Sequence, residues 1–235
     1  MKMKFQYTVL ILAVIFFAAC QKDNYTPPGS RLQGAILYQS DSINVSYNDV
    51  NFQLWQSGFG KLTPINVSVD QNGSYSALLF NGDYKLIIPQ GAGPFMNQTD
   101  PKTNSDTILV HVQGNQSLNI QVLPYYMIRN PRFSAGSDST ITATCKLEKI
   151  ITDANARDVD WVALYISKTT FVDTRTSIST RSINGSDITD MNNISLNAKV
   201  PVMIPTQHYV FARIGVKIAN VQNMIFSPVE KLQLK

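Results

Sequence analysis

The sequence predicts an all-β protein with two β-sandwich domains in tandem. Almost every apolar run is short, rich in Val, Ile, Tyr, Phe and Thr, and alternates with polar residues, which is the two-residue period of a half-buried strand. These runs end at Gly, Asn, Asp or Pro, which form turns, and no long window has helical periodicity. Roughly 205 residues follow residue 30, a length that suits two domains of about 100 residues each.

The first half predicts seven strands separated by explicit turns. Gly73 and Gly82 each follow an asparagine, at places where a turn needs positive φ. We expect Asn81-Gly82 to close a tight hairpin between the strands 74–79 and 83–89. Residues 91–105 form a long loop, and loops of this length are often functional. The expected strands are 31–39, 50–56, 65–69, 74–79, 83–89, 107–112 and 116–123.

The second half predicts another sandwich, with the boundary placing the domains at 31–124 and 125–235. In the strand 159–167 both faces are apolar, so Trp161 is expected in a central strand that is buried on both sides. Strand number and length resemble an immunoglobulin or fibronectin type III sandwich. The expected strands are 139–149, 159–167, 178–183, 191–199, 209–218 and 224–234.

The amino-terminal segment predicts export. Lys2 and Lys4 precede an apolar run much shorter than the ~20 residues of a membrane-spanning helix, so residues 1–19 are expected to be a removable signal peptide. The sequence Phe17-Ala18-Ala19-Cys20 resembles the lipobox of bacterial lipoproteins, which implies cleavage before Cys20 and its acylation. We therefore expect a lipid anchor at Cys20.

A short polar tether is expected between the lipid and the first domain, over residues 20–30. Its prolines, Pro27 and Pro28, favour extended backbone. The sequence Gln21-Lys22-Asp23-Asn24 resembles the charged tetrapeptide that directs Bacteroidetes lipoproteins to the outer face of the outer membrane. The resemblance implies an outer-membrane protein that faces the cell exterior.

Charge and cysteine usage exclude some classes of function. The chain has a net charge of +4, and removal of residues 1–19 takes away Lys2 and Lys4, which leaves +2. No stripe of Lys or Arg is present, so we expect no nucleic-acid partner. Apart from Cys20, only Cys145 remains, and its alternating neighbours predict a buried side chain on the same strand face as Ile141 and Leu147.

Four motifs in the first half follow one another in a characteristic order. In that order they resemble the carboxypeptidase-regulatory or transthyretin-like β-sandwich, over residues 31–124. The arrangement of the whole chain resembles the DUF3823 lipoproteins of Bacteroidetes. That family tends to be encoded beside starch-utilisation-type outer-membrane porins and glycan-capturing lipoproteins, which implies a role in glycan or nutrient uptake, and it brings no catalytic residue. The motifs are Gly34-Ala35-Ile36, Val50-Asn51-Phe52-Gln53-Leu54, Val69-Asp70-Gln71-Asn72-Gly73-Ser74-Tyr75 and Phe80-Asn81-Gly82-Asp83-Tyr84-Lys85-Leu86.

Aromatic residues beside amides give the candidate ligand site. Alternation places Trp55 on the face opposite the apolar residues of its strand, together with Asn51 and Gln53, and Phe59 follows on a glycine-flanked loop. An exposed indole stacks on a sugar ring while the amides bond its hydroxyl groups. The alternative is that Trp55 packs under the loop 91–105 or against the second domain.

Catalytic, metal and cofactor sites are not expected. Neither His111 nor His208 has a nucleophile motif nearby. Aspartates are concentrated at turns, where they cap backbone amides, so a glycosidase carboxylate pair is not favoured. The polar loop with Asp153, Asn155, Asp158 and Asp160 has a density of oxygen ligands that calcium uses, but a solvated loop is preferred because Arg157 lies within it.

Three Asp-Ser/Thr-apolar sequences resemble the O-glycosylation signal of exported Bacteroidetes proteins, and we expect glycan on some of Ser42, Thr107 and Ser139. The favoured function is a non-enzymatic surface lipoprotein, accessory to glycan or nutrient uptake, that binds saccharide or a partner protein of the uptake complex. The second is a structural or adhesive module without a small ligand. The third is a glycoside hydrolase.

Overall fold

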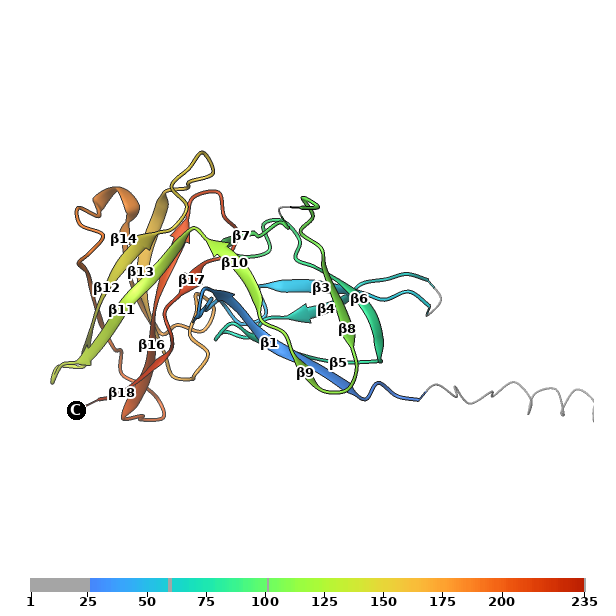
Figure 1. Ribbon diagram of the computed structural model, residues 1–235. Helices are drawn as coiled ribbons and strands as arrows, with labels where there is room; N and C mark the ends of the chain where they lie inside the picture. Colours follow the sequence, from blue (N-terminus) through green and yellow to red (C-terminus); the bar gives the residue numbers. More distant parts are fainter. Residues whose placement is uncertain (1–25, 59–60, 101, 235) are drawn as a thin grey trace, which may run out of the picture.

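The computed structural model describes residues 26–58, 61–100 and 102–234, and in these residues almost all regular structure is β-strand (Figure 1). The predicted all-β class with two successive sandwiches is confirmed. One short 3-10 turn, Gly185–Asp187, is the helical element in the described part of the chain. No helix there has the length and apolar character to cross a lipid bilayer.

The first sandwich consists of two sheets around an apolar interior. β1 (Ser30–Tyr38) is the centre of one sheet: it pairs antiparallel with β2 (Asp41–Ser42) and β5 (Ser74–Leu79), and parallel with β9 (Gln116–Ser117) and β10 (Ile120–Pro124). β10 also pairs with β7 (Phe95–Asn97). The other sheet has the order β4 (Ile65–Ser68), β3 (Asn51–Trp55), β6 (Gly82–Ile87) and β8 (Ile108–Val112).

Two details of this sandwich differ from the sequence expectation. The turn Asn81-Gly82 does not close a hairpin, because β5 pairs with β1 whereas β6 pairs with β3 and β8. Gly82 has a φ of 140°, and it carries the chain from one sheet to the other. The long loop 91–105 contains a short strand, β7, which the sequence reading missed because it has only three residues.

The glycine of the first motif is required by a close approach of two strands. A Cβ atom on Gly34 would lie 1.9 Å from the carbonyl oxygen of Leu118. The hydroxyl of Tyr75 donates a hydrogen bond to the same oxygen, at 2.5 Å. The glycine and the tyrosine of two separate motifs therefore meet at one carbonyl group, which is a physical reason for both.

The second sandwich faces a three-stranded sheet against a five-stranded one. The smaller sheet has the order β11 (Tyr126–Ala135), β12 (Thr140–Lys149) and β15 (Ile194–Lys199). The larger has the order β14 (Ser179–Asn184), β13 (Val159–Ser167), β16 (Tyr209–Ile218) and β17 (Ile225–Phe226), and β18 (Glu230–Gln233) also pairs with β16.

The long strand β11 was missed in the sequence because it contains Pro131. The ladder with β12 shifts register between Arg129 and Arg132, and Asn130 has a φ of 49°. Proline is tolerated at such a bulge because the extra residue does not donate to the ladder. The first domain ends with β10 at Pro124 and the second begins with β11 at Tyr126, so Tyr125 alone separates the two strands.

The expected central strand and the expected burial of Cys145 are confirmed, although Trp161 itself is only half-buried. β13 lies between β14 and β16, and all residues from Val162 to Ser167 are buried. Cys145 is buried on the same face of β12 as Ile141 and Leu147. Burial raises the pKa of the Cys145 thiol to about 12, so the thiol stays protonated and is a poor nucleophile.

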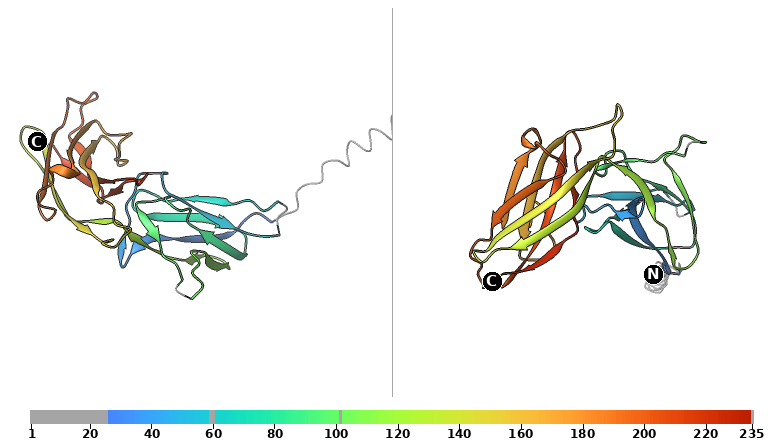
Figure 2. Two further views of the ribbon diagram at one scale, coloured as in Figure 1. Left: turned by 90° about the horizontal axis from the view of Figure 1, so that it is seen from above. Right: turned by 60° about the vertical axis from the view of Figure 1, so that its left-hand side comes forward.

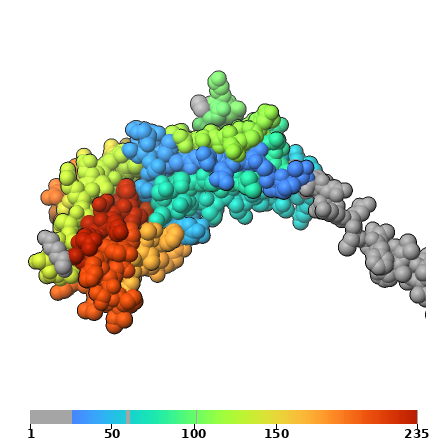
Figure 3. Space-filling model, turned by 90° about the horizontal axis from the view of Figure 1, so that it is seen from below, coloured from blue at the N-terminus to red at the C-terminus, as the bar shows by residue number. Residues whose placement is uncertain are grey.

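The two domains share one continuous apolar core, and a buried arginine lies at their contact. Arg213 on β16 is 0% exposed. Its guanidinium donates to Val45 O at 3.1 Å and Gln71 O at 3.0 Å in the first domain, and to Ser227 O at 2.9 Å and Val172 O at 3.4 Å in the second. Figure 3 shows the orange segment of the second domain pressed against the blue and teal segments of the first.

Candidate functional site

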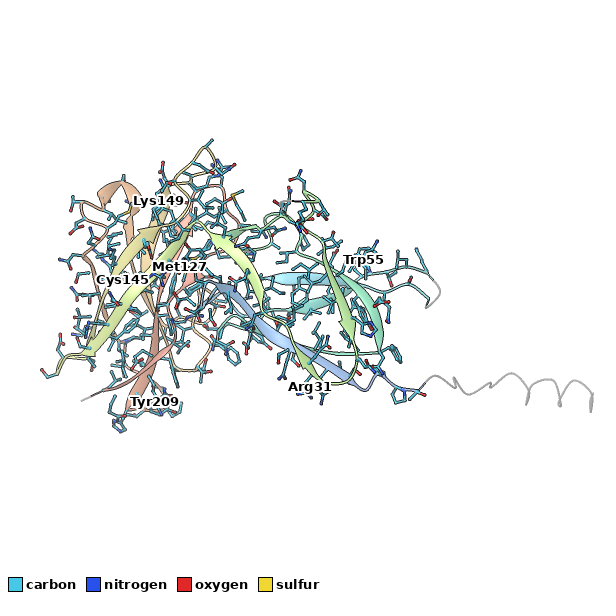
Figure 4. The ribbon with its side chains drawn as sticks, in the orientation of Figure 1. Arg31, Trp55, Met127, Cys145, Lys149 and Tyr209 are labelled. Atoms are coloured by element: carbon cyan, nitrogen blue, oxygen red, sulfur yellow. The ribbon has the colours of Figure 1, made fainter. Side chains whose placement is uncertain are left out.

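Trp55 lies at the end of the first domain that is remote from the second domain (Figure 4). Asp49, just before β3, accepts a hydrogen bond from Arg175 of the second domain at 3.0 Å. β3 then runs away from that contact at about 3.3 Å per residue, so its last residue, Trp55, is far from the domain interface. The alternative in which Trp55 packs against the second domain is therefore wrong.

The expected alternation along β3 is confirmed. Phe52 and Leu54 are fully buried, whereas Asn51, Gln53 and Trp55 are half-buried on the outer face of the sheet. The indole N–H of Trp55 donates to the Gln53 side-chain oxygen at 3.2 Å. This hydrogen bond fixes the orientation of the indole ring.

Strand register brings further side chains beside Trp55. Trp55 on β3 is opposite Lys85 on β6, and Lys85 is opposite Leu109 on β8. Two residues further along the same ladder, and on the same face, Asp83 is opposite His111, and Asp83 Oδ1 lies 2.7 Å from His111 Nδ1. A row of aromatic, cationic and aliphatic side chains therefore crosses three strands of one sheet face, with a His–Asp pair next to it.

These side chains line a cavity of about 440 Å³ that is open to solvent. Leu109 is 77% exposed, which is unusual for a large aliphatic residue and places an apolar surface in the cavity beside the indole. Lys85 forms no hydrogen bond or ion pair with a described residue, so its three N–H donors are free. The lining residues are Trp55, Ser57, Leu62, Asp83, Tyr84, Lys85, Leu109, Val110 and His111, and none of them comes from the loop 91–105 or the second domain.

The structure brings only some of the predicted ligand-binding residues together. Gln53 contacts Trp55, but neither Gln53 nor Asn51 lines the cavity. The Asn51 side-chain oxygen instead accepts a hydrogen bond from the Ser68 hydroxyl at 2.8 Å. Phe59 lies outside the described residues, as does Cys20, the expected lipidation residue.

Lys85, Leu109, Asp83 and His111 were missed. In the sequence, each alternates correctly with buried neighbours on its own strand, and this alternation was the available signal. What the sequence lacks is the order β3-β6-β8 and its register, since residues 55, 85 and 109 meet only after the strands have paired.

The cavity has no arrangement typical of a hydrolase. Ser57 and His111 both line it, but no hydrogen bond joins them, and Asp83 is exposed, whereas a catalytic triad uses a buried acid. Asp83 is the one carboxylate among the described lining residues, and a glycosidase uses two. His208, the other histidine, does not line the cavity. Its backbone oxygen accepts a hydrogen bond from Leu234 N at 2.8 Å, and its side chain forms no hydrogen bond with a described residue.

The acidic loop considered for calcium has internal partners for its side chains. The Asp153 carboxylate accepts the Asn155 backbone N–H at 2.8 Å, and Asp158 is 3.5 Å from the Lys149 ammonium group. In the described ranges of the chain, no group of three or more His, Cys, Asp and Glu side chains has a geometry that could hold a metal ion.

The three predicted glycosylation residues are all at least partly accessible. Ser42 is exposed on β2, and Thr107 is half-buried just before β8. Ser139 is half-buried in the turn between β11 and β12, with a φ of 63°. Accessibility is a requirement for modification, and the glycan itself stays a prediction for these three positions.

Comparison with known proteins identifies both domains. The family model described as "Protein of unknown function (DUF3823) N-terminal domain" matches residues 30–123, and the DUF3823 C-terminal domain matches residues 126–231. A comparison with curated proteins finds no match.

Solved structures show the same two-domain fold. A DUF3823 family protein from Parabacteroides merdae is 31% identical with a TM-score of 0.76, and one from Bacteroides ovatus is 28% identical with the same TM-score. Each comparison covers 88% of this chain and 100% of the other. A protein from Bacteroides uniformis described as a candidate carbohydrate-binding protein is 17% identical, with a TM-score of 0.68 and the same coverage, and shows the fold alone. With both family models matched in order over most of its length, this chain belongs to the DUF3823 family.

Proposed function

We propose that this protein is a non-enzymatic, lipid-anchored surface protein that binds saccharide at the Trp55 cavity as an accessory to glycan or nutrient uptake. The observation that carries the proposal is a solvent-open cavity in which the half-buried Trp55 ring is next to the exposed Leu109 and to Lys85, which has no partner among the described residues. Apolar surface with a few polar groups at its edge is the composition of small-molecule sites.

The chemistry of a sugar ring matches this arrangement. The C–H face of a pyranose packs on the flat indole and on Leu109, while its hydroxyl groups accept from Lys85 and donate to Asp83. The Asp83–His111 pair is exposed, so it exchanges water for ligand at little cost in desolvation. Further support comes from the relative described as a candidate carbohydrate-binding protein.

The position of the cavity suits a protein held at a membrane by Cys20. The described chain enters the first domain at the end remote from the second domain (Figure 2), and Trp55 lies at the same end (Figure 4). Ser30 and Gln56, the residue after Trp55, both donate hydrogen bonds to Asn81. Ser30 is ten positions beyond Cys20 in the sequence, and an extended chain of this length reaches at most about 35 Å. The Trp55 cavity is then the membrane-proximal site, beside a porin partner in the outer membrane, and the second domain is distal.

The test is binding of the full-length protein, in detergent, to a broad glycan array, with Trp55→Ala beside the unmodified protein. We expect binding to at least one glycan class and a loss of tenfold or more in Trp55→Ala, because stacking of a ring on an aromatic side chain contributes about 1–3 kcal/mol where it has been measured for nucleic-acid bases, and about 1.4 kcal/mol is tenfold in affinity. Leu78→Ala is the matched control, since Leu78 is an exposed apolar residue on the other sheet. Equal binding by Trp55→Ala, with an unchanged unfolding temperature, would falsify the assignment of this cavity.

A second candidate function, a scaffold that holds a partner protein, is favoured by one loop of the second domain. Val202 is 94% exposed and Ile204 is 85% exposed, on either side of the buried Met203. The amide of Gln207 fixes this loop, donating to Lys168 O at 2.9 Å and to Tyr209 O at 2.8 Å. Absence of glycan binding, together with a discrete crosslinked partner from a photoreactive residue at position 202 in intact cells, would favour the scaffold over the saccharide binder.

A further inference from the structure

A second cavity, of about 530 Å³, lies between the two domains and shares no residue with the Trp55 cavity. Five segments of the sequence line it: residues 90–99 and Asp106 of the first domain, the linker residue Tyr125, the β12–β13 connection at 155–157 and the β16–β17 connection at 220–222. In Figure 1 both connections lie at the upper end of the second domain, next to β7. We call this cavity the interdomain cleft.

Hydrogen bonds hold the walls of the interdomain cleft in place. The side-chain amide of Asn223, in the second domain, donates to Ala92 O at 2.8 Å and to Asp49 O at 3.3 Å, both in the first domain. Lys217 Nζ donates to Val221 O at 2.5 Å and to Gln222 O at 2.7 Å, which fixes the β16–β17 connection. The cleft is therefore formed before any ligand arrives, which lowers the ordering cost of binding.

The side chains in the cleft, in contrast to its backbone, have unused hydrogen-bonding groups. The amides of Gln90, Asn155, Asn220 and Gln222, the guanidinium of Arg157 and the hydroxyl of Tyr125 form no side-chain hydrogen bond with a described residue. Four amides supply donors and acceptors in equal measure, which is what a ligand rich in hydroxyl groups requires.

The charge of the cleft is balanced. Arg157 is its one cation and Asp106 its one anion among the described lining residues, and Asp106 already accepts a hydrogen bond from Asn97 at 3.3 Å. The Tyr125 ring, half-buried at the domain junction, adds a flat apolar surface. An uncharged, polyhydroxylated ligand with an apolar ring face fits these groups better than a phosphate, a peptide of one charge sign or an apolar molecule.

We propose that the interdomain cleft is a second saccharide subsite that binds a neutral glycan, with Tyr125 as the stacking platform and the amides of Asn155 and Gln222 as hydroxyl partners. It is separate from the Trp55 cavity, and either site can bind without the other. Because its two walls belong to different domains, the cleft exists only in the two-domain protein.

The probe is a panel of neutral hexasaccharides of glucose, xylose, mannose and galactose, titrated by calorimetry into the full-length protein in detergent. Three variants are compared with the unmodified protein: Trp55→Ala, the double variant Asn155→Ala/Gln222→Ala, and the control Asn197→Ala/Gln233→Ala. All four amides are exposed and form no side-chain hydrogen bond, so the two double variants remove equal numbers of surface amides from a folded protein.

Binding that survives Trp55→Ala and falls at least tenfold in Asn155→Ala/Gln222→Ala, with the control unchanged, supports the cleft. Binding lost in Trp55→Ala and unchanged in Asn155→Ala/Gln222→Ala overturns the cleft and leaves the Trp55 cavity standing. A tenfold preference for a uronate-containing hexasaccharide over its neutral counterpart overturns the assignment of a neutral ligand. No heat with any member of the panel overturns both sites for these sugars.

Discussion

The interface around Arg213 and the cavity around Trp55 use polar groups in opposite ways. At the interface, the Arg213 guanidinium donates to four carbonyl oxygens from both domains, and its Cζ atom lies 4.5 Å from the centre of the Phe226 ring. At the Trp55 cavity, Lys85 has no hydrogen-bond or ion-pair partner among the described residues, and the Asp83–His111 pair is exposed to water.

This difference separates structural from functional polar groups. A buried polar group in which every nitrogen atom has a hydrogen-bond partner, as in Arg213, stabilises the fold and fixes orientation, because leaving such a group unpaired in an apolar environment is costly. An exposed group with free donors contributes little to folding and is available to a ligand. By this criterion the Arg213 interface fixes the relative position of the domains, and the Trp55 cavity and the interdomain cleft are the two proposed ligand sites.

The largest expected effect is on the interface. Arg213→Met removes the donors to Val45 O, Gln71 O, Ser227 O and Val172 O while keeping an apolar side chain. Gln71 O keeps the Val45 backbone N–H as a donor, whereas the other three oxygens lose the donor that Arg213 supplies. We expect the free energy of unfolding in urea to fall by about 3–5 kcal/mol. Arg181→Met, at an exposed position of β14, is the control and should change it by less than about 0.5 kcal/mol. A loss below about 1 kcal/mol in Arg213→Met would contradict the structural role.

An intermediate effect is expected at Asp173, which is buried at the edge of the same interface and accepts hydrogen bonds from Arg175 and Thr176. Burial by itself raises the pKa of Asp173, but the hydrogen bonds from Arg175 outweigh it, and the pKa lies below its usual value. A carboxyl with a lowered pKa contributes stability that is present above the unfolded pKa and is lost as the pH falls.

Asp173→Asn should therefore reduce the free energy of unfolding by about 1–3 kcal/mol at pH 7. The gap between its free energy of unfolding and that of the unmodified protein should begin to narrow as the pH falls below about 4, where the carboxyl of the unfolded chain becomes protonated, and it should keep narrowing as the pH falls through the lower native pKa. Denaturant curves from pH 7 to pH 3 measure both quantities, with Asp153→Asn in an exposed loop as control. A gap that is constant over this range would show that the pKa of Asp173 is the same in the native and the unfolded protein.

The smallest effect on stability, and a clear one on binding, is expected at the Trp55 cavity. Asp83→Asn removes one charge of an exposed pair with His111, so the free energy of unfolding should change by less than about 0.5 kcal/mol. Affinity for a saccharide bound at this cavity should fall about threefold to tenfold, the loss of one hydrogen-bond acceptor. Asp160→Asn, at an exposed position of β13, should alter neither quantity. A large fall in the free energy of unfolding in Asp83→Asn would show that the Asp83–His111 pair stabilises the fold.

The sequence was most informative where a local pattern is sufficient. The alternation of Phe52 and Leu54 with Gln53 and Trp55 gave the correct faces of β3, because side chains in a strand point to opposite sides in turn. Where a strand contained a proline at a bulge, as β11 does at Pro131, the local pattern was misleading. The turn at Gly82 was recognised as a turn, but its destination was wrong, since a turn does not reveal which strand its successor pairs with.

The ligand residues divide in the same way. Trp55 was recognised because it is a large aromatic residue on the polar face of its strand. Lys85, Leu109 and His111 each occupy an exposed position of a regularly alternating strand, so the local sequence does not single them out. The interdomain cleft could not be predicted from the sequence, because its five segments come from both domains.

By itself, the sequence determined the all-β class, the two sandwiches, the burial of Cys145 and the outward face of Trp55, because each follows from spacing along the chain. Only the tertiary structure decided which strands are neighbours and that Arg213 donates hydrogen bonds to both domains. It also decided which polar side chains lie beside Lys85 in the Trp55 cavity and beside Tyr125 in the interdomain cleft. The physical reason is that strand pairing and domain contact depend on long-range packing between complementary surfaces, which spacing along the chain does not encode.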